Sequence, residues 1–170
     1  MRICIKALVL LLVAQSFWTV AAPACAATLT ASVNASVNKP LVLTKVQDLD
    51  MGTVTLGTGV WSNATVSISQ AGVMSCGSAN VVCSGATMAA TYNVQGSKQQ
   101  VVHISVPNVT LVNQSNSSQT LALTTNAPAT LTLANSGFPG SNFSIGGSVT
   151  LNSNTPSGVY VGTMNVTVDY

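Results

Sequence analysis

Apolar and polar residues alternate along residues 29–38, where every odd position is apolar and every even position is polar. Successive side chains of a β-strand point to opposite faces, so this pattern predicts a strand with one apolar stripe. The stripe consists of Leu29, Ala31, Val33, Ala35 and Val37. Pro40 follows, and a proline breaks a strand ladder and restricts the residue before it. We therefore expect the strand to end in a hinge.

The last residues of the chain repeat the alternation. After Gly158, one predicted strand face carries Tyr160, Gly162, Met164, Val166, Val168 and Tyr170. An apolar strand without an obvious partner at one end, and a long amphipathic strand at the other, favour subunits that join edge to edge. The pattern therefore indicates a structural role.

Between these ends, short alternating runs separated by turn residues predict an all-β domain. The expected strands are residues 41–46, 53–56, 64–69, 87–94, 101–106, 110–112, 120–124, 129–133, 143–145, 148–151 and 159–170. Gly96 and Ser97 are placed to form a tight hairpin between two of them. The spacing of roughly 8–15 residues between strands is typical of a two-sheet sandwich. We expect this sandwich to span residues 39–170, after a separate N-terminal strand, residues 28–38.

Residues 1–27 have the pattern of a cleaved export signal, with basic residues, a short apolar run at 7–13 and small residues at 24–27. A transmembrane helix needs about 20 apolar residues, and polar residues interrupt this run. Lipidation at Cys25 is an alternative, but Ala-Pro-Ala before it matches the usual leucine-led motif poorly. We expect an exported chain without a transmembrane segment in its mature part.

Charge is sparse after the predicted signal. The cations are Lys39, Lys45 and Lys98, and the anions are Asp48, Asp50 and Asp169. Nucleic-acid binding needs a basic patch, which this chain lacks. High hydrophobic content argues against disorder. Charge usually protects a monomeric protein from association, so this composition favours self-assembly.

Two cysteines, Cys76 and Cys83, remain after the predicted signal. Export leads to an oxidising compartment, where such a pair forms a disulfide. Closing so short a loop contributes about 2–3 kcal/mol in the chain-entropy model. Two thiols are too few for a structural zinc site.

Few residues could carry catalysis. His103 is the one histidine, and no Gly-x-Ser-x-Gly motif accompanies it. Asp48 and Asp50 would face the same side of one strand, whereas glycoside hydrolysis needs carboxyl groups on both sides of a cleft. A calcium site would need further oxygen ligands from carbonyls and asparagines. We expect no enzyme activity, no cofactor and no metal.

Three stretches are similar to a known family. They are LVLTKVQDLDMGTV at residues 41–54, FSIGGSVTL at 143–151 and NTPSGVYVGTMNVTVDY at 154–170. Together they resemble the bacterial exported family called domain of unknown function 4402. Met51 stands where that family usually has phenylalanine. The family name assigns no activity.

The two ends of the chain also resemble those of chaperone–usher pilins, in which a glycine precedes an alternating C-terminal strand that closes with an aromatic residue. Gly158 stands twelve residues before Tyr170, although Tyr170 is terminal rather than penultimate. The resemblance implies an incomplete immunoglobulin-like sandwich, a periplasmic chaperone and an outer-membrane usher. It also implies that residues 29–37 are a donor strand and that residues 159–170 border the acceptor site.

Three hypotheses for residues 28–38 remain open: pairing within the chain, pairing with another chain, or a disordered tail. The first function that we expect is a pilus- or fimbria-like subunit at the cell surface, assembled by donor-strand pairing with like subunits. The alternative is a self-contained secreted or surface-attached binding domain, such as an adhesin or a carbohydrate binder, with residues 28–38 paired internally.

Overall fold

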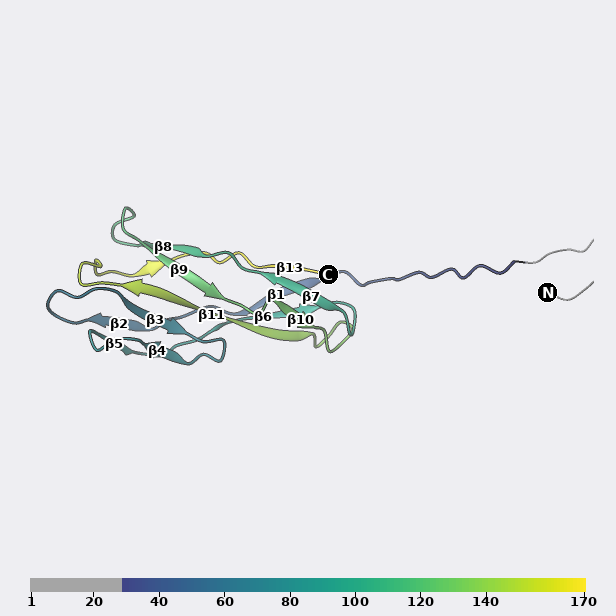
Figure 1. Cartoon of the computed structure of the whole chain (residues 1–170), viewed down its shortest axis with the longest axis horizontal. Helices are drawn as coiled ribbons and strands as arrows, with labels where there is room; N and C mark the ends of the chain where they lie inside the picture. The colour runs from purple at the N-terminus through teal and green to yellow at the C-terminus, as the bar shows by residue number, and fades with distance from the viewer. Residues whose placement is uncertain (1–28) are drawn as a thin grey trace, which may run out of the picture. The chain divides into compact units, whose positions relative to one another are not determined.

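The computed structural model of the protein describes residues 29–170. The predicted export signal, residues 1–27, lies outside the described residues. The chain divides into two units, Met1–Ala35 and Ser36–Tyr170, and all strands of the described part belong to the second (Figure 1). None of the described residues belongs to a helix that could span a membrane.

The described chain is all-β, as the alternation predicts. Its strands are β1 (Val42–Gln47), β2 (Thr53–Leu56), β3 (Ala64–Ile68), β4 (Met74–Cys76), β5 (Val81–Ser84), β6 (Ala90–Gln95), β7 (Val101–Ser105), β8 (Val109–Asn113), β9 (Thr120–Asn126), β10 (Thr130–Thr132), β11 (Ser141–Leu151), β12 (Tyr160–Val161) and β13 (Thr167–Asp169). Figure 1 shows β2 to β5 toward one end of the Ser36–Tyr170 unit and β7, β10 and β13 toward the other.

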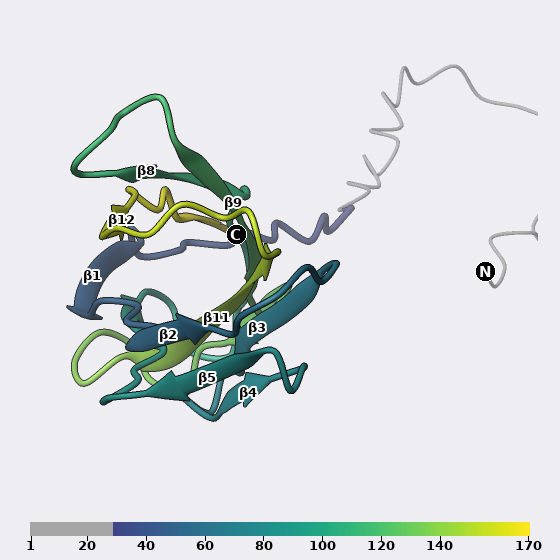
Figure 2. The same cartoon turned by 90° about the vertical axis from the view of Figure 1, so that its left-hand side faces the viewer.

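The strands form a sandwich-like arrangement of antiparallel sheets. The longest path runs β1-β6-β11-β9-β8-β12, and β3 and β4 extend from β11. A three-stranded sheet has the order β10-β7-β13, and β2 pairs with β5. In the end-on view, β8 and β12 lie in one layer, β2, β4 and β5 in the other, and β1 at the side (Figure 2).

Strand β11 connects the two layers. Its first half pairs with β6, and its second half pairs with both β3 and β9. Residues 143–145 and 148–151 were expected to be separate strands, but they are one. The reason is Gly146 and Gly147: a Cβ at Gly146 would overlap the carbonyl oxygen of Ile68, and one at Gly147 would lie 2.9 Å from Leu123 Cδ1. Their missing side chains let the neighbouring strands approach.

The core consists of two clusters of buried apolar side chains. One, around Val94, Val102 and Ile145, includes the stacked rings of Tyr92 and Phe143, whose centroids lie 5.7 Å apart. The other includes Val66, Leu123, Val149 and Leu151. In the strand expected at residues 87–94, Ala90, Tyr92 and Val94 are buried as the alternation predicts, whereas Met88, expected on the same face, is 43% exposed and precedes β6.

Other predictions need correction. β4 and β5 were not expected, because runs of three and four residues give too little periodicity. The hairpin at Gly96 and Ser97 is wrong, since β6 and β7 belong to different sheets. The expected strand 159–170 is divided into β12 and β13.

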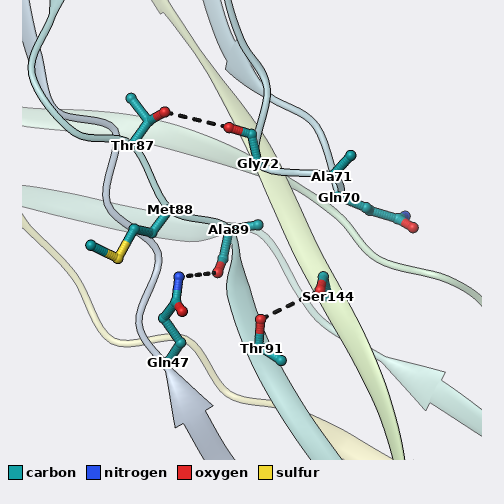
Figure 3. Close-up of a pocket in the computed structure, with 9 residues that line it drawn as sticks. All are labelled: Gln47, Gln70, Ala71, Gly72, Thr87, Met88, Ala89, Thr91 and Ser144. Carbon is teal, nitrogen blue, oxygen red and sulfur yellow. Dashed lines mark hydrogen bonds between the residues drawn. The ribbon is translucent and has the colours of Figure 1, made fainter.

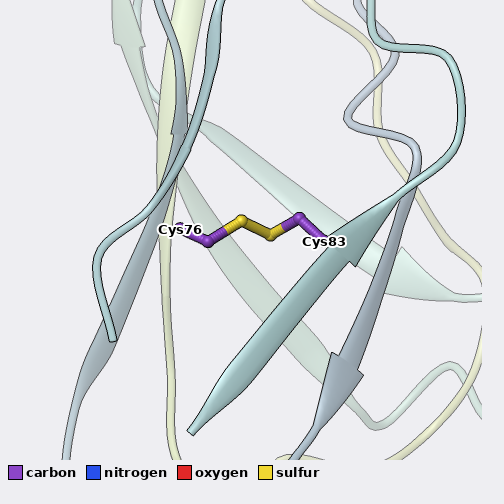
Figure 4. The surroundings of a disulfide bond; sticks show 2 residues. All are labelled: Cys76 and Cys83. Atoms are coloured by element: carbon purple, nitrogen blue, oxygen red, sulfur yellow. A yellow bond between two sulfur atoms is a disulfide. The ribbon is translucent and has the colours of Figure 1, made fainter. Parts of the chain in front are cut away.

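The predicted disulfide between Cys76 and Cys83 is confirmed (Figure 4). The two Cα atoms lie 6.3 Å apart, within the range that a disulfide spans. Because Cys76 belongs to β4 and Cys83 to β5, the bond joins the β2–β5 pair to the β3–β4 pair.

We expect the double substitution Cys76→Ser and Cys83→Ser to lower the free energy of unfolding by about 2–3 kcal/mol, because the unfolded chain loses its closed loop. Urea denaturation followed by circular dichroism measures this. Amide exchange should accelerate more in β5 than in β11, because β5 has one partner strand and β11 has several. An unchanged unfolding midpoint would contradict the prediction.

Candidate functional site

The candidate site is the side of the sandwich bounded by β1 and residues 160–170, here called the seam. β1 and β12 are the two ends of the longest strand path, and β13 is one of the two ends of the three-stranded sheet. Each therefore uses one edge for pairing. Within residues 29–170, no ladder joins β1 to residues 160–170. The seam thus has two free strand edges facing it.

Packing brings the two borders of the seam close together at one end. A Cβ at Gly96 would lie 2.6 Å from Tyr170 Oη and 2.8 Å from Leu41 Cδ2. Gly96 therefore provides the space in which both residues sit. Further along the seam, Leu49 and Met164 each pack against both core clusters.

Hydrogen bonds fix the Tyr170 end of the seam. The Tyr170 hydroxyl donates to the Lys39 carbonyl at 2.6 Å and accepts from Ser97 N–H at 2.9 Å. Lys39 N–H in turn donates to Ser97 Oγ at 2.7 Å. The chain therefore enters the sandwich next to its own C-terminal residue.

The C-terminal border of the seam has a half-buried inner face. Val168 lies opposite buried Ile104 in the β7–β13 ladder, and Met164 and Val166 pack against the same cluster. Residues 162–166 belong to no strand. The strands that pair with this border, β7 and β8, are separated by Pro107, and proline has no N–H to donate to a ladder. Among the described residues, the middle of this border therefore belongs to no ladder.

The β1 border is more open. Leu43 lies opposite Val94, and Lys45 lies opposite Tyr92, so both residues of β1 are on the core-facing side. Yet Leu43 is 36% exposed, and the Lys45 side chain is 55% exposed. The inner face of β1 is therefore incompletely covered.

Lys45 forms an ion pair on this inner face, with Nζ donating to Asp48 Oδ1 at 2.8 Å. The hydrogen bond and the charge of Asp48 raise the pKa of Lys45 above its ordinary value, so the ammonium stays charged at neutral pH. Burial raises the pKa of Tyr92, an effect that the nearby Lys45 charge opposes. A charge thus lies over a partly open core.

Gly158 and Asn113 determine where the C-terminal border begins. Asn113 is 2% exposed, and its Nδ2 donates to Gln119 Oε1 at 2.8 Å and to the Ser157 carbonyl at 3.1 Å. Its Oδ1 accepts from Ser115 N–H at 2.9 Å. A Cβ at Gly158 would overlap the Asn113 side chain. Gly158 is therefore required for this close approach.

The predicted donor residues are exposed. Leu29, Val33 and Val37 are 98%, 92% and 90% exposed, and Ala31 and Ala35 are exposed as well. Residues 29–40 belong to no strand. Pairing of this segment with another chain stays a prediction, and the stripe that it needs is available to a partner.

The other candidate residues do not converge. Asp50 accepts from Gly52 N–H at 2.8 Å, and Asp48 pairs with Lys45. His103 lies on the exposed face of β7, between Thr130 and Asp169 in the ladder. Residues 29–170 hold no group of three or more His, Cys, Asp or Glu side chains that could bind a metal.

A shallow hollow of about 490 Å³ lies beside the C-terminal end of β1, with Gln47 among its lining residues (Figure 3). Its polar side chains bond to one another, to the backbone or to a neighbouring side chain. Gln47 bonds to the Ala89 carbonyl, Thr87 to the Gly72 carbonyl, Thr91 to Ser144, and Gln70 to Asn126. None of the nine lining residues is aromatic. The hollow therefore lacks the stacking surface and the unpaired donors that would favour a sugar ring.

Sequence reasoning missed two features of the seam. Lys45 occupies the next inner position after Leu41 and Leu43, so the period of two could have identified it as core-facing. The buried side chain of Asn113 gave no comparable signal, because its partners are distant in sequence or lie in a loop.

The comparisons with known proteins agree with the resemblance of the three sequence stretches. No curated protein and no solved structure matches the chain. The family described as Domain of unknown function (DUF4402) matches residues 41–170, which include both borders of the seam. The chain therefore belongs to the family described as Domain of unknown function (DUF4402).

Proposed function

We propose that the chain is a structural subunit of a bacterial surface fibre, in which residues 29–37 of one subunit pair as a strand in the seam of the next. It is exported, kept from premature pairing by a periplasmic chaperone, and passed to an outer-membrane usher. Its role is structural rather than catalytic. The observation that carries this proposal is the pair of free edges beside a partly covered core.

The seam has the features that an added strand requires. An added strand gains main-chain hydrogen bonds from free edges and specificity from its alternate side chains. The edges of β1 and of residues 162–166 offer the main-chain hydrogen bonds. Half-buried Met164, Val166 and Val168 offer an apolar surface for the alternate side chains of the added strand.

The N-terminal segment has the complementary features. Residues 29–38 carry no charge and no residue that breaks a strand. Burying Leu29, Val33 and Val37 would give roughly 5–8 kcal/mol before the costs of ordering and association. A linear assembly follows if every subunit both donates and accepts, because such head-to-tail contacts continue without closing.

We expect deletion of residues 28–38 to abolish oligomers while leaving a folded acceptor, because all strands of the described part lie beyond this segment. Analytical ultracentrifugation of the processed chain and of the deletion variant measures the loss. A synthetic peptide of residues 28–38, added in excess, should bind the variant and suppress oligomers of the intact chain. A self-contained binding domain would instead show equal association with and without the segment.

We expect Val33→Asp to weaken self-association by about 100-fold or more, because a carboxylate would replace a buried methyl surface in the seam. Asn34→Asp is the matched control: it adds the same charge one residue away, on the polar side of the stripe. Sedimentation equilibrium gives both dissociation constants. Similar losses in the two variants would contradict pairing of the odd-numbered side chains.

A further inference from the structure

We propose that Lys45 determines which strand the seam accepts: it admits the uncharged segment 29–37 and excludes β1 of a second copy. The identity of the admitted segment rests on the proposed function. The exclusion of β1 rests on the structure of β1 alone and is tested independently of it.

The free edge of β1 keeps a regular register from Val42 to Lys45, before the bulge between Lys45 and Gln47, and this regular part is what such a device would protect. Val42 and Val46 are 50% and 60% exposed, and Leu43 is 36% exposed on the other face. β1 is six residues long, and its outer edge is unpaired among the described residues. Exposed apolar edge strands tend to pair with one another, and an inward-pointing charge is one way in which proteins prevent it.

Lys45 has the position that this device requires. It lies near the middle of β1 and opposite Tyr92, on the face that covers the core. Its ion pair with Asp48 is largely in water, with the two side chains 55% and 78% exposed. A second β1 laid along the edge would displace that water from two ammonium groups and two carboxylates. Removing charged groups from water costs free energy unless new partners fully replace the lost hydration.

The segment 29–37 avoids most of this cost. It introduces no charge of its own, so only the ammonium of the accepting chain's Lys45 is affected by the added strand, rather than two ammonium groups. The aliphatic stem of a lysine can pack on apolar surface while its ammonium reaches water. Lys45 can therefore keep its bond to Asp48 at the rim while a neutral strand pairs beside it. Specificity of this kind depends on what disfavours the wrong partner.

The experiment uses the processed full chain carrying Val33→Asp, which disables the donor stripe without altering the sandwich. Lys45→Met removes the charge and nearly keeps the length of the side chain, and Lys45→Arg keeps the charge. Lys98→Met is the matched control, because Lys98 is exposed in the connection between β6 and β7. Sedimentation velocity measures self-association, and amide exchange locates the contact.

We expect Lys45→Met to strengthen donor-independent self-association by about tenfold or more, with new exchange protection in residues 42–47, because the edge loses its inward charge. Lys45→Arg and Lys98→Met should match the parent. A second comparison uses chains with Val33 intact. Excess peptide 28–38 should dissolve the oligomers of the unsubstituted chain, whereas in Lys45→Met a fraction of the oligomers should resist the peptide.

Equal association of Lys45→Met and Lys45→Arg would overturn the proposal, as would protection that appears away from β1. A fully peptide-sensitive Lys45→Met chain would also overturn it. Failure of the proposed function has a different signature. In that case the Val33→Asp chain would associate as strongly as the unsubstituted chain.

Discussion

The organising constraint is that a strand has two edges and a sandwich core needs cover on every side. β11 meets this constraint at the centre, since it pairs along both edges and connects the layers. β1 and residues 160–170 do not meet it, because each keeps one free edge. The exposure of core-facing Leu43 and the half-burial of Met164 and Val166 follow from this one incomplete closure.

Periodicity alone predicts the parts of the fold in which one strand face is buried. It identifies the inner faces of β6 and of the C-terminal residues, because burial on one side forces alternation. It fails at Gly146 and Gly147, where two strands approach one backbone and the side-chain pattern disappears. It also fails at β4 and β5, whose placement is tied by a disulfide rather than by a long apolar stripe.

The seam is only partly readable from sequence, for a physical reason. The stripe of residues 160–170 is visible because its side chains repeat every second residue. That the opposite border is β1 depends on the order of strands in the sheets, and no local pattern encodes that order. The contact of Tyr170 with Lys39 and Ser97 likewise joins residues far apart in the chain.

Features at the start of the seam and features away from it both hold the sandwich together. The disulfide joins β4 to β5, and the buried Asn113 fixes the turn that precedes residues 160–170. The glycine pair in β11 secures the approach of β3 and β9. The sandwich therefore keeps its strand order without a strand added at the seam. In the proposed assembly, a strand added at the seam would meet this preformed order of strands.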